Sequence, residues 1–458
     1  MRASYREFIP DALVRATEEE SNLRQCRGKS GRGLAPVIVA ILCGLAVAAC
    51  GSSKPSSSAG AASSSSGGSS ASSSSTTAKA SGKPIALGAI VTETGPVATG
   101  GGYEYATNAA KAWVAWKNAT GGVNGHPVTM KILDDQGTPA TEQSDARELV
   151  QQDHVAAVFI EDQSASEAAP YLASQNIPLF SSLGDGGHTA KTNTWFGVDT
   201  GPPYGEETSL LADKAAGAKK ASNAVCSEVA VCLSFGKVLA KLAQKIGMTP
   251  GITTSIAETA TSATAQCVAM IQAKSDAINM YVGSNPISLI ANACGGQGYK
   301  GIYTTASVVD TVVKAVKAPL VLAAGSFPWW ASNPPAVQYR QIMSKYAPGA
   351  NYQGVYASNM WELLQVFSHA MTAKGPASGA AVTGKDVITA MQTGVKNLTL
   401  GGILPQPVTF SAHGQTTVRC FWPAQYKNGQ FGELQGSWTA GNGATGALKS
   451  DCIPANNF

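Results

Sequence analysis

The feature that most constrains the fold of this chain is a regular alternation of short apolar runs with longer segments of helical pattern. Ile85–Thr92, Val155–Ile160 and Ala277–Val282 are such runs, and glycine or polar residues follow each of them. Between the runs, apolar residues recur at helical spacing, for example at Ala109 and Trp113. Short strands that alternate with helices of about ten residues or more predict a parallel sheet wrapped by helices.

The alternation occurs twice, which predicts two α/β lobes. The first series has strands expected at Ile85–Thr92, Val128–Leu133, Val155–Ile160 and Ile177–Phe180. The second has them at Ser222–Val225, Val229–Leu233, Ile252–Ile256, Ala277–Val282, Ile302–Thr305 and Leu320–Ala323. Helices are then expected at Ala336–Tyr346, Val355–Ala373 and Lys385–Gln392, and short strands at Val408–Phe410 and Thr417–Tyr426. A chain of 458 residues is also too long for one ordinary hydrophobic core.

An export signal precedes the predicted lobes. Leu34–Ala49 is apolar, Arg27, Lys29 and Arg32 stand before it, and Cys50 follows two alanines. This order of positive, apolar and small residues is typical of a secretory signal, and the cysteine at its end indicates a lipoprotein lipidated on Cys50. A transmembrane anchor is the first alternative, but the run is shorter than the roughly twenty residues that a spanning helix needs. A plain secreted protein is the second.

The segment after Cys50 is a predicted tether. Gly51–Gly82 consists mostly of Ser, Gly, Ala and Thr, with almost no side chain large enough to bury. Such a segment is expected to stay flexible, with a root-mean-square reach of roughly 30 Å. We therefore expect residues 1–49 to be a cytoplasmic leader and signal peptide, and residues 50–83 to be the lipidated cysteine with its tether.

Charge and cysteine content narrow the class of protein. The formal net charge is +4 without any basic run, which argues against a nucleic-acid partner. An even number of cysteines follows Cys50, as in an extracytoplasmic protein with disulfides. Their clustering suggests the pairs Cys226–Cys232, Cys267–Cys294 and Cys420–Cys452 among the fifteen pairings possible. Zinc is the rival interpretation, but no Cys-x-x-Cys pair or histidine at ligand spacing supports it.

Ligands of open parallel sheets bind outside the carboxyl ends of the strands, and that rule selects particular loops. They are Thr92–Gly102, Glu161–Ser166 and Ser181–Gly187 in the first lobe, and Ser234–Gly236, Gly283–Pro286 and Thr304–Ser307 in the second. Their Ser, Thr, Asn and Gly residues can present hydroxyls and backbone N–H groups to a small polar ligand, or simply cap the helices that follow.

Signals for an enzyme are weak. The five histidines are scattered and no Gly-x-Ser-x-Gly motif occurs. Asp134 and Asp135 could bind a metal, but no further ligands lie near them in sequence, which favours solvated acids beside a turn. The pattern Gly296-x-Gly298-x-x-Gly301 follows a predicted helix and precedes a strand, the reverse of a phosphate-binding turn. We therefore interpret it as a helix end and turn. Trp329 and Trp330, near the expected passage back to the first lobe, are candidates for a ligand wall or for hinge packing.

In order and spacing, several of these segments resemble the Leu/Ile/Val-type solute-binding proteins of ABC importers. They are IALGAIVTETGPVATGGG at 85–102, GGVNGHPVTMKILDDQGTPATEQSDARELV at 121–150, NIPLFSS at 176–182, AINMYVGSNP at 277–286, NPPAVQYRQIMSKY at 333–346 and PVTFSAHGQ at 407–415. The resemblance implies the type I periplasmic-binding-protein fold, with two doubly wound α/β lobes joined by three hinge strands. It places the first lobe at 84–200 plus 332–405, and the second at 201–331 plus 406–458.

The resemblance also implies where a ligand would bind. A Ser/Thr loop that holds the ligand carboxylate corresponds to Gln163–Ser166, and main-chain contacts correspond to Ser182–Asp185. The candidate ligand-binding residues are Thr94, Gln163, Ser164, Ser166, Ser182, Gly184, Asp185, Phe235, Ser284, Asn285, Thr305 and Trp329. The acid that pairs with a ligand ammonium corresponds to Ala306, so Asp185, Glu161 or Asp162 takes this role or the ligand has no ammonium.

The sequence thus predicts a monomeric, lipid-anchored protein on the outer face of a bacterial membrane. It would capture a small polar solute, such as an amino acid or amide, and deliver it to ABC permease and ATPase subunits. No cofactor or metal is implied. A ligand-sensing receptor without a transport role is the alternative, and an exported enzyme is disfavoured.

Overall fold

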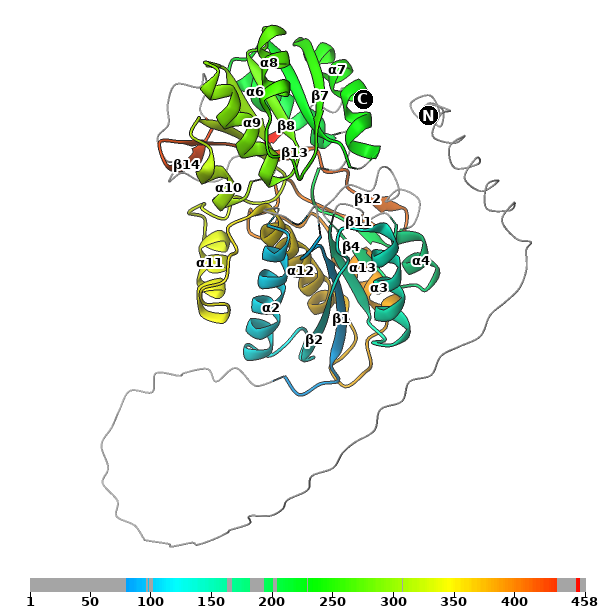
Figure 1. The fold of residues 1–458 in the computed structure, drawn as a ribbon. Coiled ribbons are helices and arrows are strands. Elements are labelled where there is room, and N and C mark those ends of the chain that lie inside the picture. Colours follow the sequence, from blue (N-terminus) through cyan, green and yellow to red (C-terminus); the bar gives the residue numbers. More distant parts are fainter. Residues whose placement is uncertain are drawn as a thin grey trace, which may run out of the picture. The chain divides into compact units, whose positions relative to one another are not determined.

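The computed structural model describes residues 80–95, 98, 102–162, 167–181, 193–200, 204–228, 230–306, 308–434 and 450–453. The side chains of residues 204–206, 230–237 and 433 lie outside this description. The described elements form two open sheets with helices packed on them, and a separate small hairpin (Figure 1). The predicted α/β class is confirmed, because the strand pairing within the main body of both sheets is parallel.

The first sheet has the strand order β2-β1-β3-β4-β5, and every neighbouring pair is parallel. Its strands are β1 (Ile85–Val91), β2 (Val128–Asp134), β3 (Ala157–Glu161), β4 (Leu179–Phe180) and β5 (Trp195–Phe196). The helices between these strands are α2 (Glu104–Ala119), α3 (Pro139–Gln151) and α4 (Ala169–Ser174).

Alternation along β1 explains why helices cover both faces of this sheet. Leu87 and Ala89 belong to the hydrophobic cluster that includes α2, whereas Ile90 packs in a second cluster with Leu149 of α3. Successive side chains of a strand point to opposite faces, so a strand that is apolar throughout needs a helix on each side. Figure 1 shows α2 on one side of β1 and α3 with α4 on the other.

The second sheet has the order β14-β13-β10-β9-β8-β6-β7, with β15 paired to β13. Its parallel strands are β6 (Lys220–Cys226), β7 (Thr249–Ile256), β8 (Ala277–Tyr281), β9 (Ile302–Thr305) and β10 (Leu320–Ala324). The antiparallel strands β13 (Cys420–Lys427), β14 (Gln430–Glu433) and β15 (Asp451–Cys452) extend it on one edge. The helices are α6 (Tyr204–Ala215), α7 (Ala230–Lys245), α8 (Thr264–Gln272), α9 (Ser284–Gly296) and α10 (Asp310–Ala315).

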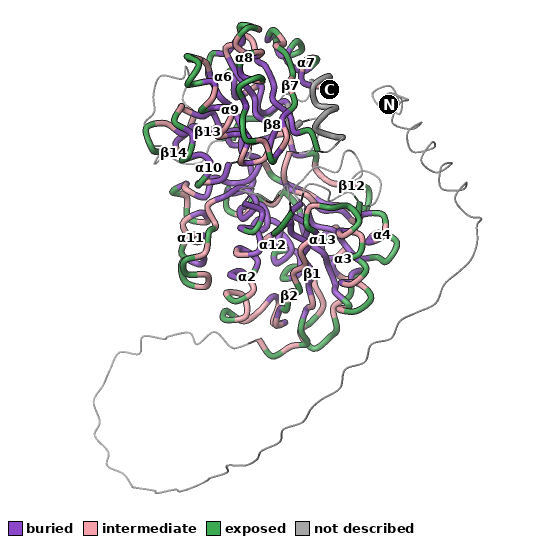
Figure 2. The backbone as a smooth tube through the Cα atoms, in the orientation of Figure 1, coloured by how far each residue is buried: buried purple, intermediate pink, exposed green. Residues whose placement is uncertain are grey.

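After β10 the chain returns to the first sheet. It forms α11 (Pro334–Tyr346), α12 (Val355–Lys374) and α13 (Gly384–Gly394), and α12 packs on α2 and β3. Most residues of α12 are buried, as the tube in Figure 2 shows, because neighbouring helices and the sheet surround it. An apolar surface on nearly all sides is expected of such a central helix.

The chain leaves the first sheet for the last time only after a small hairpin. Strands β11 (Phe410–Ser411) and β12 (Gly414–Gln415) pair with each other, and Phe410 packs edge-on against Phe196 of β5, with 5.2 Å between ring centroids. Asn193 donates to the carbonyl of Ala412 at 2.8 Å. The hairpin therefore packs with first-sheet elements. The lobe boundaries given above stay predictions.

One predicted strand is wrong, and several elements were not predicted. Residues 230–233 of the expected strand Val229–Leu233 lie in α7. A short apolar run suits a buried strand and a buried helix equally well, so the sequence pattern does not distinguish the two. The strand β5 and the helices α6 and α10 lay in segments with weak periodicity. The interpretation of Gly296–Gly301 as a helix end is confirmed, because α9 ends at Gly296 and Gly298 has a φ of 85°.

The disulfides follow the predicted clusters where the structure describes them. Cys267 of α8 is bonded to Cys294 of α9, and Cys420 of β13 is bonded to Cys452 of β15. Cys226 is also disulfide-bonded. The side chain of Cys232, its predicted partner, lies outside the described residues.

Candidate ligand-binding site

The carboxyl ends of the parallel strands define where a ligand would meet each sheet. In the first sheet, β1 and β3 end at Val91 and Glu161. In the second sheet, β6, β8 and β9 end at Cys226, Tyr281 and Thr305. The described parts of the site are the segments that follow these residues, together with the passages of chain between the two sheets.

The loop after β1 is held by Asp134 at the end of β2. The Thr94 hydroxyl donates to Asp134 Oδ2 at 2.5 Å, and the backbone N–H of Glu93 donates to Oδ1 at 2.9 Å. Burial acts to raise the pKa of Asp134, but the hydrogen bonds from Thr94 and from nearby backbone N–H groups lower it below its ordinary value. This network shapes the start of the loop, and it engages the Thr94 hydroxyl in the process.

Behind the same edge lie two acids on α3, one fully buried and one partly exposed. Glu142 on α3 is fully buried, and its Oε1 accepts from the backbone N–H of Ala168 at 3.0 Å. Burial raises the pKa of Glu142 to about 8, and the neighbouring carboxylate of Asp135 adds to the effect. Burial also raises the pKa of Asp145 to about 6. Glu142 therefore favours its protonated form near neutral pH and positions the segment before α4 through its bond to Ala168.

Three acids from separate segments gather where the chain passes between the sheets, and we call them the hinge acid cluster: Glu161, Asp199 and Glu362. The carboxyl of Asp199, which follows β5, packs so closely on Gly325 that a Cβ there would meet it at 1.6 Å. Glu362 on α12 accepts from the N–H of Phe327 at 3.0 Å.

The carboxyls of the hinge acid cluster differ in how far their pKa values are raised. Burial raises the pKa of Glu362 well above its ordinary value, and the charges of Asp199 and Glu161 raise it further. Burial likewise raises the pKa of Asp199 to about 6. Asn359 donates to Glu161 at 3.5 Å, so an amide stabilises the third member. Carboxyls that are buried close together cannot all be ionised without a cation, so protons occupy part of the cluster.

The segment between β9 and α10 contacts the start of α12. Val309 pairs with Gly354 in an antiparallel bridge, and the N–H of Val355 donates to the carbonyl of Val308 at 2.9 Å. Gly102, with a φ of 75°, lies under Val309, where a Cβ would come within 3.0 Å of its side chain. These contacts hold the segment after β9 against the starts of α2 and α12.

The edge of the second sheet is organised by Glu258. This residue follows β7, is 4% exposed, and accepts from the N–H of Gly283 at 2.6 Å. Burial raises its pKa to about 6, and the charge of Glu228 contributes. Asn285 donates to the carbonyls of Glu258 and Ala260 at 2.9 and 3.1 Å, so its amide nitrogen positions the loop.

Glu258 also belongs to the group of possible metal ligands that the described residues contain. Its carboxylate, that of Glu228 and the sulfur of Cys226 lie within 4.8 Å of one another. A sulfur in a disulfide is not a thiolate, and Cys226 is disulfide-bonded. Two carboxylates then remain, which is a weak set for holding a metal ion.

The family comparison matches this arrangement. The family described as periplasmic binding protein matches residues 84–430, which is most of the chain. This chain belongs to the periplasmic binding protein family. Its fold is accordingly the type I periplasmic-binding-protein fold, as predicted, and its family is one of extracytoplasmic solute-binding proteins and not of enzymes. No helix among the described residues has both the length and the apolar character needed to cross a membrane.

Solved structures resemble this periplasmic binding protein at low sequence identity. The branched-chain amino acid binding protein LivJ of Streptococcus pneumoniae, in complex with isoleucine, is 18% identical, with a TM-score of 0.62 over 81% of this chain and all of that one (100%). A Rhodopseudomonas palustris solute-binding protein in complex with 3,4-dihydroxybenzoic acid is 16% identical, with a TM-score of 0.61 over 76% and 95% of the chains.

A third similar structure is a fatty acid ABC transporter substrate-binding protein from Thermomonospora curvata. It is 18% identical, with a TM-score of 0.64 over 78% of this chain and 93% of that one. At these identities the likeness establishes the fold of this binding protein alone. No curated protein sequence matches the chain.

The structure describes five of the candidate ligand-binding residues. Thr94 is exposed, Ser284 and Thr305 are buried at the ends of their loops, and Asn285 is half-buried. Trp329 is 4% exposed and packs edge-on against Trp330 and Phe431, with centroids 4.7 and 5.4 Å away. Its neighbours are therefore aromatic side chains, and its role as a ligand wall or as hinge packing stays a prediction.

The other predicted positions lie outside the described residues. They are Gln163, Ser164, Ser166, Ser182, Gly184 and Asp185, with the lipidation site Cys50. Phe235 lies in α7, and its side chain is outside the description as well. Their part in ligand binding stays a prediction.

Sequence reasoning missed Glu258, Asp199 and Glu362. Glu258 follows the predicted strand Ile252–Ile256, so a search for acids just after strand-like runs would have found it, whereas Asp199 follows β5, which was not predicted. Glu362 gives no such signal, because it lies inside the apolar helix α12 and reaches the cluster only through packing.

Proposed function

We propose that this periplasmic binding protein is the capture component of an ABC importer and binds a small polar solute between its two lobes. The observation that carries the proposal is the family match over residues 84–430, which spans both sheets and the passages between them. The polar and acidic groups at the strand ends support a polar ligand. An amino acid, an amide or a related metabolite fits this chemistry.

Hinge closure is the proposed mechanism. Each lobe would supply part of the site, so the ligand stabilises the closed state through contacts that the open state lacks. The passages between the sheets contain the close packing of Asp199 on Gly325 and the backbone bond of Phe327 to Glu362. These contacts would keep the hinge in register while the lobes move.

The presence of an ammonium on the ligand is a separate question within the proposal. Glu161 is fully buried and receives a hydrogen bond from Asn359, so its surroundings favour a hinge role over ligand contact. Similar proteins bind isoleucine, 3,4-dihydroxybenzoic acid or a fatty acid, so the fold accommodates ligands with and without an ammonium. Comparing the binding of ligand pairs that differ only in the ammonium group tests whether the site requires it.

The test begins with the purified protein. We expect mass spectrometry of the native protein to show a small co-purified solute at one molecule per chain. A thermal-shift screen of amino acids, their deaminated analogues, amides, short peptides and aromatic acids should then find a stabilising ligand. At a hundred times its Kd, a ligand adds about 2.7 kcal/mol to the free energy of unfolding. The absence of a shift with every class of polar metabolite would count against the proposal.

Transport is distinguished from sensing in cells. Deleting the gene should abolish uptake of the radiolabelled ligand if the protein serves an importer. If uptake is unchanged while a ligand-dependent response is lost, the protein is a receptor.

Lipid anchoring through Cys50 is the remaining part of the proposal. The apolar run, the two alanines and the cysteine at the end of Leu34–Ala49 support it. We expect Cys50→Ala to release the protein from the membrane fraction with its ligand affinity unchanged. Retention of the variant in the membrane would show that another segment holds it there.

A further inference from the structure

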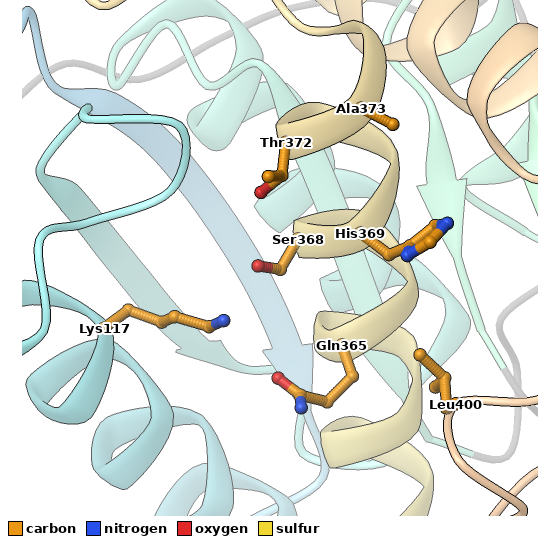
Figure 3. A pocket seen from close by; sticks show the side chains of 7 residues that line it. All are labelled: Lys117, Gln365, Ser368, His369, Thr372, Ala373 and Leu400. Atoms are coloured by element: carbon orange, nitrogen blue, oxygen red, sulfur yellow. The ribbon is translucent and has the colours of Figure 1, made fainter.

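A pocket lies between α2 and α12, away from the candidate ligand-binding site. Its volume is about 380 Å³, and its lining includes Lys117, Gln365, Ser368, His369, Thr372 and Leu400 (Figure 3). The helix α2 begins beside the carboxyl end of β1 and runs back along the sheet, so Lys117 in its last turn is near the opposite edge. Just after α12, the carbonyl of Pro376 accepts a hydrogen bond from the side chain of Asn124, which precedes β2. The end of α12 therefore lies at the edge of the sheet where β2 begins.

Lys117 brings a positive charge that the described residues do not neutralise. Its Nζ lies 4.4 Å from the ring centroid of Trp116 and 5.5 Å from that of Trp113. The ion pairs found within the described part of the chain involve other lysines, Lys131 and Lys314. Indole faces attract an ammonium but carry no net charge, so the charge of Lys117 stays uncompensated.

The partial burial of Lys117 makes this arrangement costly. Burial lowers the pKa of Lys117 to about 8, because an ammonium loses hydration in the pocket. The position of Lys117 in the last turn of α2 acts in the other direction, since the carbonyl end of a helix favours a cation. An anion that enters the pocket would restore the lost stabilisation of the ammonium.

The remaining polar groups of the pocket can all donate hydrogen bonds. Figure 3 shows the hydroxyls of Ser368 and Thr372 on the side of α12 that faces Lys117. The Gln365 Oε1 already accepts from Trp113 Nε1 at 2.8 Å, which leaves the amide N–H groups of Gln365 to donate. No carboxylate is among the lining residues. A cation with hydroxyl and amide donors beside it is the chemistry that recognises a carboxylate.

We propose that this pocket binds a small organic carboxylate, with its carboxylate on Lys117 and Ser368 and its apolar body towards Leu400 and Ala373. The volume is within the range of small-ligand pockets, which begins at about 300 Å³. The lining supplies both parts of such a molecule, because Leu400 and Ala373 are apolar. The site is distinct from the one between the lobes, and either proposal can fail without the other.

Amine labelling of the full chain tests the proposal, with benzoate as the probe and benzamide as its uncharged analogue. The rate of acetylation by an amine-acetylating reagent is followed at Lys117 by peptide mass spectrometry. Lys111, which is exposed on the same helix, is the internal control. At ten times the benzoate Kd, we expect labelling of Lys117 to slow about tenfold with no change at Lys111. A solute held between the lobes does not cover Lys117, so it cannot produce this result.

A substitution locates the carboxylate within the pocket. Ser368→Ala should raise the benzoate concentration for half-protection about tenfold, because a hydrogen bond to a charged group is lost. Ser288→Ala, which removes a hydroxyl on α9 of the other sheet, should leave it unchanged. The proposal is overturned if benzoate does not slow the labelling of Lys117, if benzamide protects equally well, or if the two serine variants behave alike.

Discussion

The sharpest energetic prediction concerns Asp213, a carboxyl buried beneath the second sheet. Asp213 lies on α6 and is fully buried. It accepts hydrogen bonds from Asn279 Nδ2 at 2.6 Å and from the Thr304 hydroxyl. Burial nevertheless raises its pKa from 3.8 to about 7, because desolvation outweighs those two bonds. We expect Asp213→Asn to remove a pH-dependent loss of stability.

The sign follows from proton binding in the two states. Between pH 4 and pH 7 the folded chain holds a proton on Asp213 that the unfolded chain has released, so folding is favoured by acid. Stability from this group is fully present below its unfolded pKa and declines as the pH rises through the folded pKa. With a folded pKa of about 7, the loss between pH 5 and pH 8 is about 2.5 kcal/mol.

The introduced amide can satisfy the same partners. Its oxygen accepts from Thr304, and its nitrogen can donate to Asn279 once that amide rotates, since Asn279 Oδ1 has no hydrogen bond within the described part of the chain. Urea unfolding at pH 5 and pH 8 then measures the effect. From pH 5 to pH 8, we expect the unfolding free energy of the wild type to fall by about 2.5 kcal/mol more than that of Asp213→Asn.

The matched control is Glu148→Gln, which removes a carboxylate from a surface pair with Lys131. A surface pair contributes less than about 1 kcal/mol, so its effect should change little between the two pH values. If Asp213→Asn and wild type lose stability in parallel from pH 5 to pH 8, the assignment of a raised pKa to Asp213 is wrong.

Three further predictions rest on single contacts. In Gly325→Ala the added Cβ would meet Asp199 Oδ1 at 1.6 Å, so we expect a loss of about 1–3 kcal/mol in urea unfolding and weaker solute binding by calorimetry; unchanged values would contradict the packing described for the hinge. Removal of the Cys267–Cys294 disulfide, which closes a loop with a sequence separation of 27, should cost about 3–4 kcal/mol, measured on the double alanine variant. Thr383→Ala breaks the capping box of α13 and should cost about 1 kcal/mol, with faster hydrogen exchange at the start of that helix alone.

Much of the fold could be predicted from local patterns. The strands at Ile85–Val91 and Ile302–Thr305 and the long helix at Val355–Lys374 coincide with runs of strong periodicity. The prediction failed where a pattern was short, as at residues 230–233, because a few apolar residues suit both a buried strand and a buried helix. The position of the hairpin at 410–415 could not be predicted either, because it depends on packing against Phe196, which is distant in sequence.

The site divides in the same way. The rule that ligands bind at strand ends selected the loops that contain Thr94 and Asn285. It could not show that the Thr94 hydroxyl donates to Asp134, or that the Asn285 amide donates to the carbonyl of Glu258. A hydrogen bond between residues far apart in sequence leaves no periodic mark, so it is visible only after folding.

The amino-acid sequence by itself determined the class of this protein: most of the strand and helix order, and the resemblance to the binding-protein family. These properties are local or additive along the chain, and residue periodicity and spacing record them. Only the tertiary structure decided which charges meet. It gathered Glu161, Asp199 and Glu362 at the hinge, buried Asp213, and placed Lys117 opposite Ser368. The energy of a charge depends on its surroundings, and those surroundings come from distant segments.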